Sequence, residues 1–240
     1  MKDAIVIIPT YNEIENIEAI IHAVFSCSDM FHILVVDDNS PDGTAKKVIE
    51  LQDVYKDKLF LLQRQEKTGL GTAYIAGFKW SLKENYEYVF EMDADFSHNP
   101  NDLIKLYNAC HNNQADVAIG SRYVKGVNVV NWPMSRILLS YFASKYVRFV
   151  TGMKIHDTTA GFVCYKRDVL ETIDLNNIKF VGYAFQIEMK FKAYLKKFNI
   201  VEVPVIFTDR AKGKSKMSGG IISEAIFGVI NMKIKSLFKR

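Results

Sequence analysis

The apolar positions in the first half of the chain come in short, often β-branched runs, separated by segments with helical spacing. Runs of this kind, bounded by polar or turn residues, predict strands. They lie at residues 4–8, 33–36, 59–62, 88–92 and 115–119. Because strands and helices alternate, we expect an α/β fold in which helices cover a mostly parallel sheet.

Helices are predicted where apolar residues recur at a spacing of three or four. One follows the first strand, with Ile17, Ile21 and Val24 on its apolar side, and Pro41 with Asp42 marks the start of the next. The second half is less regular, with predicted helices over 133–150 and 185–198 and predicted strands over 162–165 and 200–207.

The chain ends in a basic segment. Residues 210–240 contain eight Lys or Arg and one acid, Glu224, although the net charge of the whole chain is only +4. A loop rich in Gly, Lys and Ser over 212–220 leads into a terminal helix with an apolar side and a basic side. We therefore divide the chain into a main domain, 1–210, and a basic loop with an amphipathic helix, 211–240. An anionic partner is expected, but not a nucleic acid, because the tail has no fold that reads bases.

Several protein classes are disfavoured. Cys27, Cys110 and Cys164 form no C-x-x-C pair, so neither a zinc site nor a disulfide framework is indicated, and a reducing cytosol fits. The apolar run at 4–8 is too short for a signal peptide, and charged residues interrupt the later apolar stretches, so no membrane span is expected. The Gly-x-Gly at 69–71 lacks the third glycine of a dinucleotide loop and is interpreted as a tight loop entering a helix. No P-loop motif occurs, which excludes a P-loop nucleotidase.

Acidic residues directly follow three of the predicted strands. Tyr11 and Glu13 come after the first strand, Asp38 after the second, and Asp93 and Asp95 after the fourth. In open α/β sheets ligands bind beyond the carboxyl ends of the strands, and in the common strand order 3-2-1-4 these three loops share one crevice. We therefore expect these side chains to meet in one site.

The Asp93-Ala94-Asp95 sequence offers two carboxylates to a hard divalent cation that would take its other ligands from water and substrate phosphates. For an isolated Asp-x-Asp, the more common role would be to cap the helix starting at Pro100, through Asp95 or Asn99. The two other acidic loops favour the cation here.

Short motifs follow one another along nearly the whole chain, at 8–13 (IPTYNE), 36–44 (VDDNSPDGT), 69–74 (GLGTAY), 92–98 (MDADFSH), 120–123 (GSRY), 135–136 (SR) and 203–207 (VPVIF) with Arg210. In this order they resemble the motifs of dolichol-phosphate mannose synthases, which are family 2 glycosyltransferases with the GT-A fold. The resemblance implies a Rossmann-like GT-A sheet with a C-terminal amphipathic helix. It also implies an inverting enzyme that transfers a hexose onto a polyprenyl phosphate at the membrane. The hexose implied is mannose, and the donor is GDP-mannose.

The resemblance also implies roles for individual residues. The nucleotide would lie among Pro9, Tyr11, Glu13, Asp38 and Asp93, and Asp93 with Asp95 would hold Mg2+ or Mn2+ against its diphosphate. Four basic residues would bind the acceptor phosphate: Arg122, Arg136, Arg210 and Lys216. Of these, Arg122, Arg136 and Arg210 would also act in catalysis, together with Asp95. In the stretch at 157–163 the chain departs from the family, with Val163 in place of an arginine.

The acceptor decides whether a catalytic base is required. Related transferases that act on a sugar hydroxyl place an aspartate in a Glu-Asp pair, whereas this chain has Gln186-Ile187-Glu188. A phosphate monoester has a second pKa of about 6 and is already largely dianionic at neutral pH. We therefore expect a phosphate oxygen to attack the anomeric carbon directly.

Two predicted helices carry apolar faces beside basic residues. For the helix over 133–150 the pattern fits an interfacial or a core position equally, whereas for the terminal helix it favours an anionic membrane surface. The expected location is cytoplasmic, peripheral to the inner face of the membrane. Two alternatives stay open: a family 2 transferase that uses UDP-glucose, another donor or a sugar hydroxyl acceptor, and a non-catalytic subunit that binds a sugar nucleotide.

Overall fold

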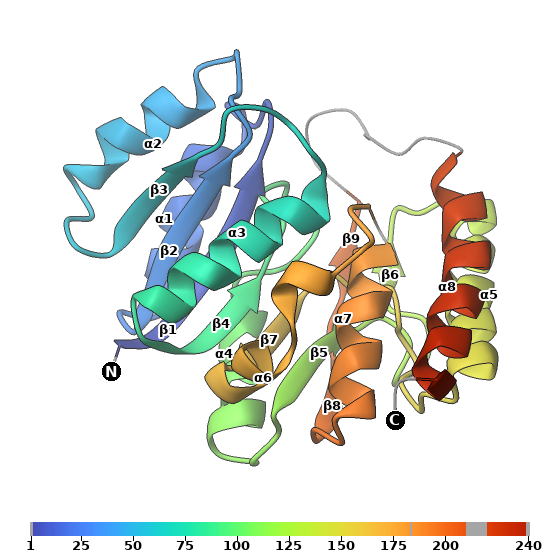
Figure 1. Cartoon of the computed structure of the whole chain (residues 1–240). Coiled ribbons are helices and arrows are strands. Elements are labelled where there is room, and N and C mark those ends of the chain that lie inside the picture. Colours follow the sequence, from blue (N-terminus) through green and yellow to red (C-terminus); the bar gives the residue numbers. More distant parts are fainter. Residues whose placement is uncertain (1, 183, 210–219, 239–240) are drawn as a thin grey trace.

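The computed structural model of the chain describes residues 2–182, 184–209 and 220–238, and a seven-stranded mixed sheet forms its centre (Figure 1). The strand order is β3-β2-β1-β4-β7-β5-β8, and β7 runs antiparallel to both of its neighbours. The strands of this sheet are β1 (Lys2–Thr10), β2 (Phe31–Asp37), β3 (Leu59–Gln63), β4 (Tyr86–Glu91), β5 (Val117–Ser121), β7 (Val163–Lys166) and β8 (Ile200–Pro204). Two short strands pair in a second sheet, β6 (Val129–Val130) and β9 (Phe207–Thr208).

Helices pack on both faces of the main sheet. The helices on one face are α1 (Ile17–Cys27), α2 (Thr44–Gln52) and α4 (Asp102–His111). Those on the other face are α3 (Leu70–Lys83), α6 (Arg167–Thr172) and α7 (Ala184–Leu195), with a 3-10 turn (Leu175–Asn177) before α7. Two further helices, α5 (Met134–Thr151) and α8 (Gly220–Phe238), lie side by side, and α8 also contacts α7 (Figure 1).

The central strands are apolar on both faces because helices cover both faces. In β1, Val6 packs among residues of α1 and α4, whereas Ile5 and Ile7 pack among residues of α3 and α7, and all three are fully buried. Strands in such a position appear in the sequence as continuous apolar runs. The predicted α/β fold with a mostly parallel sheet is confirmed, and the first four strands have the order 3-2-1-4 assumed above.

The second half differs in detail from the sequence prediction. The strand predicted over 200–207 is divided, because β8 pairs with β5 only as far as Pro204 and the chain then moves to β6, where Phe207 pairs with Val129. Helix α8 forms within the predicted terminal segment, but residues 210–219 lie outside the described residues, so the boundary between 1–210 and 211–240 stays a prediction. In the part of the chain that the structure describes, no helix combines the length and the apolar character needed to cross a membrane.

The two glycines at the start of α3 allow a close backbone contact. The amide of Gly71 donates to the carbonyl of Val181 (2.8 Å), and a Cβ at Gly71 would lie only 2.8 Å from the carbonyl oxygen of Phe180 and from the ring of Phe185. Gly69 has a φ of +112°, a backbone conformation that residues with a side chain rarely adopt. The interpretation of this motif as a tight loop entering a helix therefore agrees with the structure.

Candidate active site

Three acidic loops lie together at the carboxyl edge of the sheet. Strand β1 pairs with β2 on one side and with β4 on the other, so the loops that follow these strands are neighbours. The first two loops are joined directly, because the Asp38 amide donates to the Thr10 carbonyl (3.0 Å) and the Asn12 amide donates to Ser40 Oγ (3.0 Å). The loops predicted to share a crevice are therefore adjacent.

Asp37, the last residue of β2, holds this edge together. Its fully buried carboxylate accepts hydrogen bonds from Thr10 Oγ1 (2.8 Å), from the Ser40 amide (2.9 Å) and from Ser40 Oγ (2.6 Å). These structural bonds occupy both carboxylate oxygens. Of the two adjacent aspartates, Asp38 is thus the one placed to meet a ligand.

Asp38 faces Arg64, the residue that follows β3. The carboxylate lies 3.3 Å from the guanidinium. Burial raises the pKa of Asp38, and the charges of Arg64 and Lys67 partly offset that effect. Asp38 Oδ1 and Arg64 Nη1 are the two atoms that face each other in this ion pair, and neither makes a hydrogen bond within the described residues. Lys67 Nζ also lies 4.4 Å from the centre of the Tyr11 ring.

The other residues of the first loop are held locally. Pro9 is half-buried at the end of β1, in register with Val36 of β2. The Glu13 carboxylate accepts a hydrogen bond from Asn16 Nδ2 (3.0 Å), and the Glu13 amide donates to Thr44 Oγ1 (3.0 Å). The first loop is therefore anchored to the start of α1 and of α2.

The loop after β4 forms a compact turn over residues 93–98, here called the carboxylate turn. The Ser97 amide donates to Asp95 Oδ1 (3.1 Å), and the Asp93 amide donates to His98 Nδ1 (3.2 Å). Asp95 is 6% exposed and Asp93 is half-buried. Both carboxylates are thus presented from one short, internally bonded backbone segment.

Asp95 does not cap the following helix. Helix α4 begins at Asp102, and its N-cap residue, Asn101, makes no side-chain cap. Asn99 Oδ1 accepts a hydrogen bond from the Asn101 amide (3.0 Å), whereas Asp95 bonds within the carboxylate turn. The capping role weighed for Asp95 therefore does not account for its position.

His98 connects the carboxylate turn to the second half of the site. Its ring stacks on Phe162 (4.9 Å between ring centres, 10° between planes) and meets Phe207 edge-on (5.3 Å). Burial lowers the pKa of His98 to about 4, so the imidazole is neutral near pH 7. A neutral ring accepts at one nitrogen and donates at the other, and the bond from Asp93 assigns acceptance to Nδ1.

Arg122 is oriented by a buried carboxylate. Its Nε and Nη2 donate to the two oxygens of Asp157 (2.7 and 2.6 Å), and Nη2 also donates to Thr159 Oγ1 (2.8 Å). Burial by itself would raise the pKa of Asp157, but the charge and hydrogen bonds of Arg122 outweigh burial and lower it. The plane of this guanidinium is therefore fixed by the protein itself.

Arg136 lies on the same aromatic side chain as Arg122. The two guanidinium carbons are 4.0 Å (Arg136) and 5.5 Å (Arg122) from the centre of the Trp132 ring. Arg136 Nη1 also donates to Asp209 Oδ1 (2.8 Å). Two of the four predicted basic residues are thus brought together. The other two, Arg210 and Lys216, lie outside the described residues.

A model of the family described as glycosyl transferase family 2 matches residues 5–174, a span that contains all three acidic loops and Arg122. The chain belongs to this family. It is a glycosyltransferase, as its motifs predict.

Named relatives match most of this glycosyltransferase. The polyprenol monophosphomannose synthase of Mycolicibacterium smegmatis is 48% identical over 236 residues, which cover 98% of this chain and 89% of the relative. The undecaprenyl-phosphate mannosyltransferase of Micrococcus luteus is 44% identical, over 93% of this chain and 90% of the relative. The dolichol-phosphate mannosyltransferase of Pyrococcus furiosus is 40% identical over 91% of this chain, which spans 60% of that longer protein. The family resemblance inferred from the motifs is confirmed.

Solved structures share the fold. Glucosyl-3-phosphoglycerate synthase from Mycobacterium tuberculosis, in complex with Mn2+, UDP and glucosyl-3-phosphoglycerate, matches with a TM-score of 0.70 and 14% identity over 98% of this chain and 80% of that chain. Its complex with Mn2+, UDP-glucose and phosphoglyceric acid gives a TM-score of 0.71 and 15% identity over 98% and 79%. At this level of identity the similarity establishes the fold alone, which is the predicted GT-A fold of a glycosyltransferase.

The sequence predicted the acidic residues and arginines of the candidate site, but not the side chains that contact and orient them. Arg64 directly follows β3, so the same carboxyl-edge argument that selected Asp38 would have found it. Asp157 lies 35 residues from Arg122 along the chain, and His98 contributes by stacking on Phe162. Both lie in stretches that the motif comparison singled out, 92–98 and 157–163, but nothing local in the sequence pairs Asp157 with Arg122 or His98 with Phe162 and Phe207.

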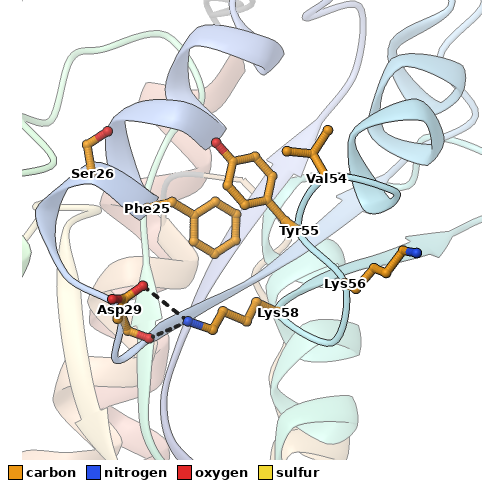
Figure 2. A pocket seen from close by; sticks show the side chains of 7 residues that line it. All are labelled: Phe25, Ser26, Asp29, Val54, Tyr55, Lys56 and Lys58. Atoms are coloured by element: carbon orange, nitrogen blue, oxygen red, sulfur yellow. Dashed lines mark hydrogen bonds and ion pairs between the residues drawn. The ribbon is translucent and has the colours of Figure 1, made fainter.

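An open pocket lies away from the candidate site, at the amino ends of β2 and β3 (Figure 2). It is lined by Phe25, Ser26, Asp29, Val54, Tyr55, Lys56 and Lys58. Phe25 stacks on Tyr55 (4.1 Å), and Lys58 Nζ donates to the Asp29 carboxylate (3.2 Å). Of the predicted site residues that the structure describes, none lines this pocket.

Proposed function

We propose that this glycosyltransferase moves mannose from GDP-mannose to the phosphate of a polyprenyl phosphate, with inversion at the anomeric carbon. The names of three relatives join mannose to a polyprenol, undecaprenyl or dolichol phosphate. The structural observation that carries the proposal is that His98 of the carboxylate turn meets the Phe207 ring, and that Arg122 lies 5.5 Å from the centre of the same ring, with Arg136 beside it on Trp132. Transfer between two phosphorylated molecules requires charge compensation on the donor side and on the acceptor side, and this arrangement can supply both.

On the donor side, the nucleotide is proposed to bind among Pro9, Tyr11, Glu13 and Asp38, with Asp93 near its diphosphate. The Asp38 carboxylate can accept hydrogen bonds and the Arg64 guanidinium can donate them, and the two groups lie 3.3 Å apart. Guanine presents N–H donors and a carbonyl oxygen along one edge, so this pair suits a guanine base.

The carboxylate turn fits a divalent cation, Mg2+ or Mn2+. Its donor set consists of two aspartate carboxylates, Asp93 and Asp95, and Mg2+ in nucleotide enzymes is typically held by one or two carboxylates together with substrate phosphates and water. Among the described residues, no three His, Cys, Asp or Glu side chains are grouped as a metal site. When bound, the cation would offset the negative charge of the departing diphosphate.

On the acceptor side, Arg122 and Arg136 are proposed to bind the lipid phosphate, together with Arg210 and Lys216. The planar guanidinium matches the geometry of a phosphate and makes short, charge-assisted hydrogen bonds to it. Because Asp157 orients Arg122 in advance, little rotational freedom of this side chain is lost when the phosphate binds.

Helix α7 supports an acceptor that needs no catalytic base. Its one acid, Glu188, is 4% exposed and accepts hydrogen bonds from the amides of Lys179 (2.8 Å) and Phe180 (3.1 Å), so its carboxylate has a structural role. A phosphate dianion carries its own negative charge and requires no deprotonation. In the proposed step a phosphate oxygen forms a bond to the anomeric carbon, and the electron pair of the breaking bond leaves with the nucleoside diphosphate.

The proposal is tested by supplying labelled GDP-mannose, UDP-glucose or UDP-N-acetylglucosamine, with Mn2+ and polyprenyl phosphate, and counting label in the organic phase. Label from GDP-mannose alone is expected. Transfer from UDP-glucose instead would replace the proposed donor. An absence of lipid-linked label with every donor would contradict the proposed function.

The exposed side of α5 and α8 is proposed to rest on an anionic membrane, at the cytoplasmic face. Large apolar side chains are exposed along both helices, including Met134, Leu138, Leu139, Phe142, Phe149, Phe227, Ile230, Ile234, Leu237 and Phe238. Phe149 and Phe238 are 89% and 83% exposed. The same two helices carry basic residues that suit anionic headgroups, namely Lys145, Arg148, Lys233 and Lys235.

Replacing both Phe149 and Phe238 by serine is expected to lower binding to anionic vesicles at least about tenfold, because burying one such side chain contributes roughly 1.5–3 kcal/mol. Flotation with phosphatidylglycerol vesicles measures the bound fraction. Val54→Ser, at a 67% exposed apolar residue between α2 and β3, is the matched control and should bind as the wild type does. Equal binding of all three proteins would remove this surface from the proposal.

A further inference from the structure

A nearly buried carboxylate on the edge strand β8 contacts both of the segments that carry Arg122 and Asp157. Glu202 is in register with Ile119 of β5, and its side chain is 9% exposed. Side chains two residues apart in a strand point to the same face, so Ser121 lies diagonally opposite Glu202 on that face. Ser121 Oγ donates to Glu202 Oε1 (2.7 Å). Glu202 therefore binds the residue that directly precedes Arg122.

The same carboxylate also binds the segment that leads into β7. The amide of His156 donates to Oε2 of Glu202 (2.8 Å), and the amide of Asp157 donates to Oε1 (2.9 Å). His156 Nδ1 also lies 2.7 Å from Oε2. Hydrogen bonds to a carboxylate are roughly twice as strong as those between neutral groups. Together with the Ser121 hydroxyl, these groups give each oxygen of Glu202 two polar partners.

These contacts close a ring around the predicted acceptor arginine. The Ser121 hydroxyl also accepts hydrogen bonds from the amides two and three positions further on (3.3 and 3.1 Å), so it shapes the turn 121–124. Within this turn the amide and Nε of Arg122 donate to Asp157 Oδ2 (2.9 and 2.7 Å). The Asp157 amide then leads back to Glu202. Because the ring is closed, Arg122 can move relative to β8 only if one of these bonds breaks.

We infer that Glu202 is a positioning residue for the acceptor phosphate, because its carboxylate joins the turn 121–124 to the segment 156–157. Through this junction it sets the direction of the Arg122 guanidinium. The inference rests on the proposed function, in which Arg122 binds the phosphate of the lipid. A guanidinium that is oriented before binding loses less conformational freedom when the phosphate arrives. Loss of Glu202 should therefore weaken acceptor binding and leave donor binding unchanged, since the donor loops follow β1, β2 and β4.

Hydrogen exchange tests the junction without any ligand. Glu202→Met keeps the length of the side chain but removes the acceptor of all these bonds, so amide exchange is expected to rise at least about tenfold over both 121–124 and 156–157. The matched control is Asp116→Leu. Asp116 also joins β5 to β8, but at the opposite end, where it accepts a hydrogen bond from the Asn199 amide (2.8 Å). Wild-type exchange in either segment of Glu202→Met, or an equal rise in Asp116→Leu, would overturn the inference.

Calorimetry with farnesyl phosphate, a short isoprenyl phosphate, tests the acceptor role. Binding sites are first counted with GDP and Mn2+, so that unfolded protein does not enter the comparison. Glu202→Met is expected to raise the Kd for farnesyl phosphate about tenfold, with the Kd for GDP within about twofold of the wild type. An unchanged Kd for farnesyl phosphate, or an equal rise in both constants, would overturn the inference. If the wild type binds no farnesyl phosphate, the acceptor part of the proposed function fails instead, and the exchange experiment still decides whether Glu202 holds the two segments.

A double-mutant cycle shows whether Glu202 acts through Arg122. Arg122→Lys keeps a positive charge beside Asp157 but lacks the planar group whose direction is set. In this background Glu202→Met is expected to change the Kd for farnesyl phosphate less than about twofold, because the effects of residues that act as one unit do not add. A tenfold loss of affinity in both backgrounds would overturn the inference.

Ser121→Ala covers the case in which Glu202→Met does not fold. It removes one uncharged hydroxyl and leaves the bonds from the amides of His156 and Asp157 to Glu202 in place. The Kd for farnesyl phosphate is expected to rise about threefold, with faster exchange over 121–124, because one side of the ring is open. Wild-type affinity and exchange in the folded Ser121→Ala would overturn the inference.

Discussion

Replacing Asp95 by asparagine is expected to reduce sugar transfer about 10³-fold or more, because the variant loses the charge that would hold the cation opposite the leaving diphosphate. Asparagine has nearly the same shape as aspartate, so the substitution changes the charge of the side chain and not its size. An asparagine oxygen can still accept the hydrogen bond from the Ser97 amide (3.1 Å), so the carboxylate turn keeps its backbone. The initial rate of lipid-linked label formation measures the loss, and paramagnetic resonance of Mn2+ with GDP measures cation binding in the absence of lipid.

The control for this prediction is Asp102→Asn in the first turn of α4. Asp102 is 5% exposed, comparable with Asp95 at 6%, and pairs with Lys105 (2.6 Å) outside the carboxylate turn. Loss of one carboxylate of similar burial should therefore leave transfer and Mn2+ binding near the wild-type level. More than a few per cent of wild-type activity in Asp95→Asn, or unchanged Mn2+ binding, would contradict the role proposed for Asp95.

The parallel half of the sheet could be predicted from sequence because its signals are local. Each of β1 to β4 is a short apolar run, and the loops between them contain the helices α1, α2 and α3. The position of β7 could not be predicted in this way. It lies between β4 and β5 and antiparallel to both, so its neighbours are far from it along the chain. Only the packing of the complete chain specifies such a pairing.

The same distinction applies to the site. The acidic residues were found because each one follows a strand directly, which fixes its place at the carboxyl edge. The partners that set their environment were not found. Arg122 was predicted as a phosphate ligand from its motif, but the structure adds that both carboxylate oxygens of Asp157 bind one edge of its guanidinium. A contact of this kind depends on β5 and the segment 157–161 meeting in space.

Neutralising Asp157 is expected to have the largest effect on stability. Asp157 is fully buried and Arg122 is 7% exposed, so Asp157→Asn removes the buried carboxylate that binds this guanidinium through two charged hydrogen bonds. Breaking a buried pair in this way costs about 3–5 kcal/mol, which corresponds to a fall in Tm of roughly 6–20 °C for a domain of this size. Denaturant unfolding at pH 7 measures the change. Glu84→Gln, in the exposed pair with Lys2 (3.0 Å), is the control and should lose less than about 1 kcal/mol.

The pH dependence of the stability difference between the wild type and Asp157→Asn shows whether the charge of Asp157 causes it. Because the pKa of Asp157 is lowered in the folded state, its carboxylate contributes stability above its unfolded pKa of about 3.9, and that contribution is lost as pH falls through the lower folded value. The free energies of unfolding of the wild type and Asp157→Asn should therefore differ fully at pH 7 and converge below about pH 4. A difference that stayed constant down to acid pH would mean that shape, and not charge, makes Asp157 necessary. In that case the orientation of Arg122 would not depend on the ion pair.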